Sequence, residues 1–164
     1  MLAKDIMTEN VITIKEDDSV EYIAKLLLEY NISGLPVVND ENEVVGMITE
    51  ADLIYRSKKL KIPTHIELLG SYIFLESFKT IENQIKKMTA YKAKDMMTTD
   101  VITVDYEEDI EEIASIMIDK KINRVPVLKE GKLVGIISRK DIIKGYTRVC
   151  KIVCAFSRRA IALF

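Results

Sequence analysis

The sequence AKDIMTENVITI at residues 3–14 returns as AKDMMTTDVITV at residues 93–104. The similarity continues at an offset of 90 residues, where EYIAKLLLEYNISGLPVV matches EEIASIMIDKKINRVPVL. One deletion then changes the offset to 89, and GMITEADLI at residues 46–54 matches GIISRKDII at residues 135–143. Self-similarity over about 50 residues indicates a structural unit that is present twice. The fold prediction therefore rests on this repeat.

Each copy begins with a short strand and a helix. In the first copy the β-branched run Val11–Ile14 is typical of a buried strand, and Asp18 or Ser19 can cap the helix that follows. Apolar residues at helical spacing give this helix one buried face, and the pattern ends near Asn31. The second copy repeats the pattern with VITV and a helix from about Asp109.

Each copy then predicts a hairpin and a second helix. In the first copy Leu35–Val38 and Val44–Ile48 flank the polar turn NDEN, and a helix is expected after Thr49. In the second copy VPVL and LVGII flank KEGK, and a helix is expected after Ser138. The element order is therefore β-α-β-β-α, twice.

A single copy would bury too little of its surface to be stable alone. We therefore expect an α/β (α+β) fold in which two pseudo-symmetric β-α-β-β-α repeats pack through their sheets, with an inserted helical linker. The expected boundaries are residues 1–56 for the first repeat, 57–92 for the linker, 93–147 for the second repeat and 148–164 for a basic amphipathic tail.

The linker and the tail lie outside the repeat. FKTIENQIKKM in the linker has apolar residues at helical spacing and predicts one helix. The tail is expected to pack on its own protein or on a dimer mate; docking to a membrane surface or a partner, and a poorly ordered end, remain alternatives. Cys150 and Cys154 in the tail have no further Cys or His nearby, so we interpret them as reduced packing residues.

Composition limits the function classes. The chain is 48% hydrophobic and 30% charged, as expected for a water-soluble protein with a core. The sequence shows neither an apolar run of about 18 residues nor a signal peptide, and we expect a cytoplasmic location. Five basic and no acidic residues follow Asp141, so the remainder is net acidic. A broad basic face for nucleic acid is therefore not expected.

The sequence offers no recognisable catalytic machinery. His65 is the only histidine, and it lies in the linker beside Pro63 and Glu67 without a second His or Cys to form a metal site. A Ser-His-Asp order, a phosphate-binding glycine loop and a GxGxxG motif are all missing. We therefore predict no catalytic residues, no metal and no cofactor.

One polar pattern recurs at the same place in both copies. Thr49 is followed three residues later by Asp52, and Ser138 by Asp141, each pair at a junction between a strand and a helix. Such a pair can form a capping box at the helix N-terminus. Alternatively, the acceptor-only Asp oxygens suit two neighbouring hydroxyls such as those of a ribose. The pattern alone leaves both interpretations open.

The whole arrangement resembles the tandem CBS-domain pair, or Bateman module. The resemblance rests on KDIMT and KDMMT, on GLPVV and RVPVL, and on GMITEADL and GIISRKDI, in this order. It covers about residues 3–56 and 93–147. It implies a non-enzymatic module that binds AMP, ADP, ATP or S-adenosylmethionine, as regulatory ligands, in clefts between its repeats. Disc-like homodimers are common in the family, and we expect a homodimer.

The resemblance also implies which residues contact the ligand. Asp52 and Asp141 would hold the ribose hydroxyls, and Thr49 and Ser138 would contact ribose or phosphate. The adenine would lie against the first-strand segments and the starts of the hairpins. These positions are Ile12, Thr13, Gly34, Leu35, Pro36, Ile102, Thr103, Arg124, Val125 and Pro126.

The two copies differ in charge where a ligand would bind. The first has Gly34 and Glu50 where the second has Arg124 and Arg139. Because guanidinium groups suit phosphates and a glutamate repels them, we expect the second site to prefer the more anionic ligand.

Three functions follow from these observations. The preferred one is a sensor that binds an adenine nucleotide and regulates a partner protein in trans. The alternative is a structural or assembly module with vestigial clefts, favoured by Glu50 and by the apolar linker. An enzyme is the third, and no nucleophile or base beside the clefts supports it.

Overall fold

The described residues form two compact units. The computed structural model describes residues 1–56, 65–68, 71–74 and 90–147. Unit 1 contains Met1–Val11, Glu41–Glu43 and the described residues from Ile102 onward, and unit 2 contains Ile12–Asp40 and the described residues within Val44–Val101. Each unit thus combines most of one repeat with the first residues of the other.

Unit 2 is built on helix α2, which spans Val20–Glu29. Ser19 is its N-cap, and the Ser19 hydroxyl accepts a hydrogen bond from the backbone N–H of Tyr22 at 3.2 Å. This choice between Asp18 and Ser19 was open in the sequence. The apolar face of α2 is buried against the sheet, with Ile23 fully inaccessible. The helix is therefore held mainly by core packing.

In unit 2, the sheet that packs against α2 is a hairpin. Strands β1 (Gly34–Val38) and β2 (Val44–Thr49) are antiparallel, as predicted, and α3 (Glu50–Arg56) follows directly. The strand expected over Val11–Ile14 is wrong in its extent, because only Ile14 pairs, in parallel, with Val37. The backbone of Val11 turns instead, its N–H bonding to the Glu9 carbonyl at 2.9 Å.

Unit 1 repeats this arrangement with a third strand. Strand β5 (Val104–Asp105) is parallel to β6 (Arg124–Lys129), and β6 is antiparallel to β7 (Lys132–Ser138). Helix α6 (Ile110–Asp119) is capped by the Asp109 carboxylate, which accepts from the N–H of Glu111 at 2.9 Å. A further helix spans residues 139–147. The predicted order of elements is confirmed here, but the strand expected over Val101–Val104 is wrong in its extent, because pairing begins only at Val104.

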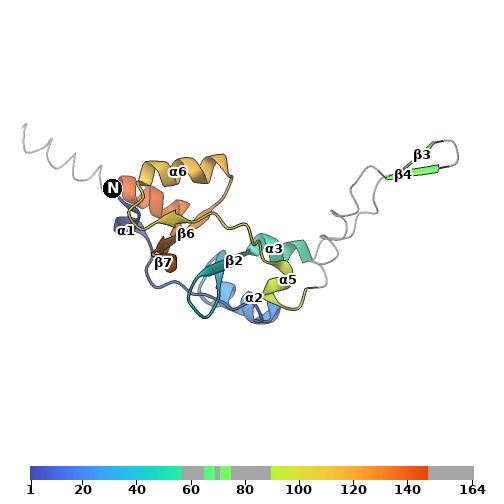
Figure 1. Cartoon of the computed structure of the whole chain (residues 1–164), viewed down its shortest axis with the longest axis horizontal. Helices are drawn as coiled ribbons and strands as arrows, with labels where there is room; N and C mark the ends of the chain where they lie inside the picture. Colours follow the sequence, from blue (N-terminus) through green and yellow to red (C-terminus); the bar gives the residue numbers. More distant parts are fainter. Residues whose placement is uncertain (57–64, 69–70, 75–89, 148–164) are drawn as a thin grey trace, which may run out of the picture. The chain divides into compact units, whose positions relative to one another are not determined.

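Each repeat begins with a short helix that packs on the unit formed mainly by the other repeat. The sequence analysis did not predict this exchange of helices. Helix α1 (Ala3–Ile6) belongs to unit 1, where the N–H of Ala3 bonds to the Glu108 carbonyl at 2.8 Å. Helix α5 (Ala93–Met96) belongs to unit 2, where the N–H of Ala93 bonds to the Asp18 carbonyl at 2.9 Å. Helix α1 lies beside β7 (Figure 1), and α5 contacts β2. The AKDxMT motif is therefore a docking segment for the hairpin of the other repeat.

The second residue after each short helix extends the sheet by one pairing. Thr8 and Ile136 exchange two backbone hydrogen bonds of 2.9 and 3.0 Å at the free edge of β7. Thr98 and Met47 do the same at β2, with two bonds of 2.9 Å. Each docking segment thus covers an edge that would otherwise expose unpaired backbone groups.

Glycine is required opposite each docking segment. A Cβ atom on Gly135 would lie 2.4 Å from the sulfur of Met7, and one on Gly46 would lie 2.4 Å from the sulfur of Met97. Such distances are far below van der Waals contact. The matched pairs of Gly and Met explain why both repeats carry Gly at this place in the second hairpin strand.

The insertion contains an element that was not predicted. Strands β3 (His65–Leu68) and β4 (Ser71–Phe74) form an antiparallel hairpin, with His65 opposite Phe74. The residues Ile66, Tyr72 and Ile73 favour strands, and this signal was available in the sequence. The helix predicted for FKTIENQIKKM and the amphipathic tail with its two cysteines lie outside the described residues.

An ion-pair cluster joins α5 to the rest of unit 2. The Asp17 carboxylate lies 2.9 Å from the ammonium groups of both Lys92 and Lys94. These two hydrogen bonds, that of Lys92 first, lower the pKa of Asp17 from 3.8 to about 2. In unit 1 the corresponding pair is Lys4 with Glu107, at 3.0 Å. Charge pairing therefore supports both docking segments.

We predict that Gly135→Ala lowers the free energy of unfolding by about 1–3 kcal/mol, because the new methyl group overlaps the Met7 side chain. Chemical denaturation measures this loss. Met7→Ala should recover part of it in the double variant, whereas Met97→Ala, the matched change in unit 2, should not. Additive losses with Met7→Ala would show that the contact with Met7 does not require the glycine.

We predict that the Asp17 carboxyl titrates with a midpoint near 2 at low ionic strength. A depressed pKa means that its ion pairs stabilise the fold above the unfolded value of 3.8, and that this contribution is lost as pH falls toward 2. Carboxyl-carbon NMR measures the midpoint. The double variant Lys92→Ala/Lys94→Ala should return it toward 3.8. A midpoint near 4 in the unmodified protein would contradict the pairing.

Candidate functional site

The predicted ligand-contact residues divide into two sets, and each set lies within one compact unit. The set of unit 2 comes from the first repeat: Ile12, Thr13, Gly34, Leu35, Pro36, Thr49 and Asp52. The set of unit 1 comes from the second repeat: Ile102, Thr103, Arg124, Val125, Pro126, Ser138, Arg139 and Asp141.

Sheet topology brings the set of unit 1 together at one end of the sheet. Arg124, the first residue of β6, is the register partner of Ser138, the last residue of β7. Strand β5 runs parallel to β6 and pairs Val104 with Val127, so Ile102 and Thr103 precede β5 at the same end. The helix of residues 139–147 also begins there.

In unit 2 the sheet pairing also brings the predicted contact residues to one end of the sheet. Gly34 at the start of β1 pairs with Thr49 at the end of β2, where α3 begins. Ile14 pairs in parallel with Val37, and its N–H bonds to the Pro36 carbonyl at 3.1 Å. The residues just before Ile14 therefore lie at the end of the sheet that carries Thr49.

Burial divides the predicted contact residues. Leu35 and Val125 are fully inaccessible in the two cores, in both side chain and main chain. In this structure neither residue is exposed to a ligand, and both serve the core. The four first-strand residues Ile12, Thr13, Ile102 and Thr103 are all half-buried.

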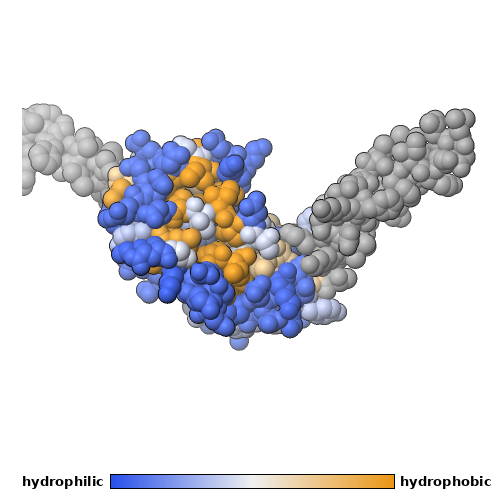
Figure 2. Space-filling model, in the orientation of Figure 1, coloured by the Kyte–Doolittle hydropathy of each residue, from blue (hydrophilic) through white to orange (hydrophobic). Residues whose placement is uncertain are grey.

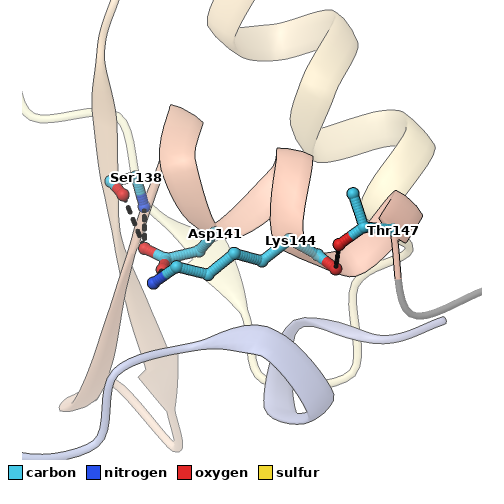
Figure 3. Close-up of polar contacts among 4 residues, drawn as sticks. All are labelled: Ser138, Asp141, Lys144 and Thr147. Atoms are coloured by element: carbon cyan, nitrogen blue, oxygen red, sulfur yellow. Dashed lines mark hydrogen bonds and ion pairs between the residues drawn. The ribbon is translucent and has the colours of Figure 1, made fainter.

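The hydroxyl and carboxylate of each site are joined by two hydrogen bonds. In unit 2, Asp52 Oδ2 accepts from the Thr49 backbone N–H at 3.0 Å and from the Thr49 hydroxyl at 2.8 Å. In unit 1, Asp141 Oδ2 accepts from the Ser138 N–H at 2.9 Å and from the Ser138 hydroxyl at 2.6 Å (Figure 3). Both carboxylates thus close the first turn of their helices.

The capping geometry leaves one oxygen of Asp141 available for other groups. An ionised carboxylate has about four lone-pair positions on two oxygens, and the two Ser138 bonds occupy those of Oδ2. Capping fixes the carboxylate's orientation without using Oδ1. The two interpretations of the motif, a helix cap and an acceptor for hydroxyls, are therefore compatible.

Lys144 was missed by the sequence analysis. Its ammonium lies 3.3 Å from Asp141 Oδ1, while the Asp141 side chain is only 13% exposed. In Figure 3 the Lys144 side chain runs beneath Asp141 and brings its nitrogen beside the carboxylate. The spacing of three residues on one helix was the available signal, since such residues share a helix face.

The charges that distinguish the two sites are accessible. Arg139 and Glu50 are exposed, and Arg124 is half-buried. Gly34, at the position of Arg124, is buried and carries no side chain. Unit 1 therefore has three cationic side chains at its candidate site: Arg124, Arg139 and Lys144. At the corresponding positions unit 2 has Gly34, Glu50 and Tyr55.

The described residues contain neither a metal-binding cluster nor a membrane-spanning helix. Within residues 1–56, 65–68, 71–74 and 90–147, no cluster of three His, Cys, Asp or Glu side chains is arranged to hold a metal ion. Over the same part of the chain, no helix has the length and apolar character needed to cross a membrane.

Curated relatives align over most of this chain. It is 35% identical over 141 residues to "Uncharacterized protein MJ1225" of Methanocaldococcus jannaschii, covering 86% of this chain and 41% of that protein. It is 31% identical to "Uncharacterized protein MJ1426" of the same organism, covering 88% of this chain and 90% of that protein. The chain thus spans nearly all of one relative and less than half of the other.

Solved structures share the fold. A crystal structure of CBSX2 of Arabidopsis thaliana in complex with AMP matches with a TM-score of 0.76 and 26% identity, covering 90% of this chain and 97% of that one. The CBS domain pair of protein MJ0100, in complex with 5′-methylthioadenosine and S-adenosyl-L-methionine, matches with a TM-score of 0.66 and 25% identity, covering 90% and 96%.

The family model of the CBS domain matches twice, at residues 3–59 and 93–148. These two segments contain the β1–β2 sheet and the β5–β6–β7 sheet, all the helices described with bounds above, and every residue of the two candidate sites. The repeat found in the sequence, its duplicated fold and the two matches agree, and the chain belongs to the CBS domain family as a tandem pair.

Proposed function

We propose that this chain is a non-enzymatic regulatory module that binds an adenine nucleotide or S-adenosylmethionine and acts in trans on a partner protein. The observation that carries the proposal is the capped aspartate of each repeat. Its side chain is fixed by two hydrogen bonds from the preceding Thr or Ser. Related CBS pairs in complex with AMP and with S-adenosyl-L-methionine support an adenosine ligand.

The proposed roles follow from the chemistry of each group. Asp52 and Asp141 accept hydrogen bonds from ribose hydroxyls, because a fixed carboxylate loses little conformational freedom when a diol binds. The Thr49 and Ser138 hydroxyls lie next to these carboxylates and contact ribose or phosphate. The half-buried residues Ile12, Thr13, Ile102 and Thr103 offer apolar and polar surface to the adenine ring.

We propose that the two sites differ in their preferred ligand. Arg124 and Arg139 belong to the set of unit 1, and guanidinium groups pair well with phosphate oxygens. Glu50 in unit 2 disfavours a phosphate placed near it. The site of Asp141 is therefore the nucleotide site, and that of Asp52 is weaker or takes a less anionic adenosine compound.

Regulation requires that the ligand favour one arrangement of the chain over another. Each docking segment begins in one repeat and packs in the unit formed mainly by the other. The backbone that leads from such a segment into the next unit carries Ile12 or Ile102. A ligand bound against these residues would therefore act on the connections between the repeats.

A second function, assembly into a homodimer, is favoured by exposed aliphatic side chains. Leu28 on α2 is 83% exposed and Ile54 on α3 is 70% exposed. Their counterparts Ile118 on α6 and Ile143 are 71% and 63% exposed. Figure 2 shows further apolar surface among the elements of unit 1, bordered by hydrophilic residues. We propose that a second copy of the chain covers these helices, with or without a nucleotide.

We predict that the chain, stripped of co-purified ligand, binds AMP, ATP or S-adenosylmethionine saturably in isothermal titration. Asp141→Asn should weaken nucleotide binding by about tenfold or more, because an amide NH₂ replaces one of the acceptor oxygens. Asp52→Asn is the matched variant and should have the smaller effect on nucleotides. Thermal denaturation of both variants separates loss of binding from loss of the helix cap.

Two results would contradict this proposal. If AMP, ATP and S-adenosylmethionine all fail to bind, assembly into a homodimer remains as the proposed function. Equal losses in the two variants would remove the proposed difference between the sites.

We predict that Ile118→Asp shifts the chain from dimer to monomer in light scattering coupled to size exclusion, because a charge buried without a partner is costly. Thr99→Asp places the same charge on an exposed position outside the helices named above and is the control. A monomeric unmodified protein, or a dimer that persists in Ile118→Asp, would contradict a contact through α6.

A further inference from the structure

Lys144 lies where a ligand would meet Asp141. It follows Asp141 by one helical turn, and its ammonium contacts Oδ1, the oxygen that Ser138 leaves unused. Figure 3 shows Ser138 and Lys144 on opposite sides of the same carboxylate. A diol that binds Oδ1 must therefore share this oxygen with the ammonium or displace it.

The ion pair is suited to displacement. Its separation is 3.3 Å, and the Lys144 side chain is 68% exposed. The Asp141 side chain is only 13% exposed, so Lys144 is the partner that can leave, since water solvates its exposed ammonium nearly as well. The contact thus orients Lys144 at the site without preventing a ligand from taking its place.

We propose that Lys144 selects ligands by their charge through an exchange of partners at Asp141. When ribose hydroxyls occupy Oδ1, the displaced ammonium moves to an anionic group on the same ligand, such as a 5′-phosphate. A neutral nucleoside breaks the ion pair and offers no replacement. This inference rests on the proposed adenine-nucleotide function and adds to it the residue that senses the phosphate.

The reach of the side chain fits this exchange. A lysine ammonium sits on a flexible four-carbon stem and can rotate about it while the helix stays fixed. In a nucleotide, a single ribose ring separates the 2′ and 3′ hydroxyls from the carbon that bears the 5′-phosphate. The ammonium can therefore leave the carboxylate and still remain close to the ligand's anionic end.

The first repeat does not have this device. Tyr55 occupies the position of Lys144 relative to the aspartate, and a phenol has no cationic group. The selection is therefore expected only at the site of unit 1. It also differs from the effect proposed for Arg124 and Arg139, because it is coupled to occupation of Asp141 by the ribose.

The test compares AMP with adenosine, which differ only in the 5′-phosphate. Isothermal titration is performed on the full chain carrying Asp52→Asn, so that binding reports mainly on the site of unit 1. Lys144→Ala should lower the ratio of AMP affinity to adenosine affinity about tenfold, with adenosine affinity unchanged or higher. Lys144→Arg keeps the charge and should largely retain the ratio.

Lys140→Ala is the matched control. Lys140 precedes Asp141 on the same helix, is exposed, and carries the same charge. Its removal should change the ratio by less than about twofold, since exposed charges at a distance are screened by salt. Melting temperatures of all variants confirm that they are folded.

The outcomes separate this inference from the proposed function. If AMP and adenosine bind but Lys144→Ala weakens both equally, or if Lys140→Ala changes the ratio as much, the inference is wrong and the adenine site stands. If neither compound binds the unmodified chain, both fail. A selective loss of AMP affinity with Lys144→Ala supports the partner exchange.

Discussion

The fold depends on one pairing of backbone groups that occurs twice. Thr8 bonds to Ile136 and Thr98 bonds to Met47, each through two hydrogen bonds. These bonds place the docking segment of one repeat on the hairpin of the other, and in both units the segment's methionine then lies against a glycine. A side chain on that glycine would force the segment away from the sheet edge. Docking of the AKDxMT segment thus depends on the glycine of the second hairpin strand, although the segment and the glycine lie far apart in the chain.

The same arrangement positions the candidate sites. Pairing of β6 with β7 ends at Ser138, and the helix that follows begins with a cap supplied by Asp141. Asp52 caps α3 in the same way after Thr49. Because the cap uses Oδ2, its structural role and the proposed ligand role fall on different atoms of one side chain. The same carboxylate can therefore stabilise the helix start through one oxygen while the other can accept a hydrogen bond from another group.

The sequence alone predicted the helices and hairpins of each repeat. It did not predict that the first short helix of each repeat packs on the unit formed mainly by the other repeat. Periodicity located α2 and α6, and polar turns located the two hairpins, because both signals are local. The strand over Val11–Ile14 was overestimated, since β-branched residues indicate extended backbone but not whether a partner strand lies beside it. No local signal shows that α1 packs against β7, because that contact depends on residues more than a hundred positions away. The Asp–Lys144 contact, by contrast, was readable from helical spacing.

Duplication explains why the two sites can diverge without loss of the fold. The backbone pairings, the caps and the Gly–Met contacts are repeated in both units, and these are the features that the core requires. Charge at positions 50, 55, 124, 139 and 144 is not constrained in this way, because these side chains lie at or near the surface at the end of each sheet. A tandem pair can therefore keep one scaffold and give each repeat its own ligand preference. A signal that fills the site of unit 1 alone would then be distinguishable, within one chain, from a signal that fills both.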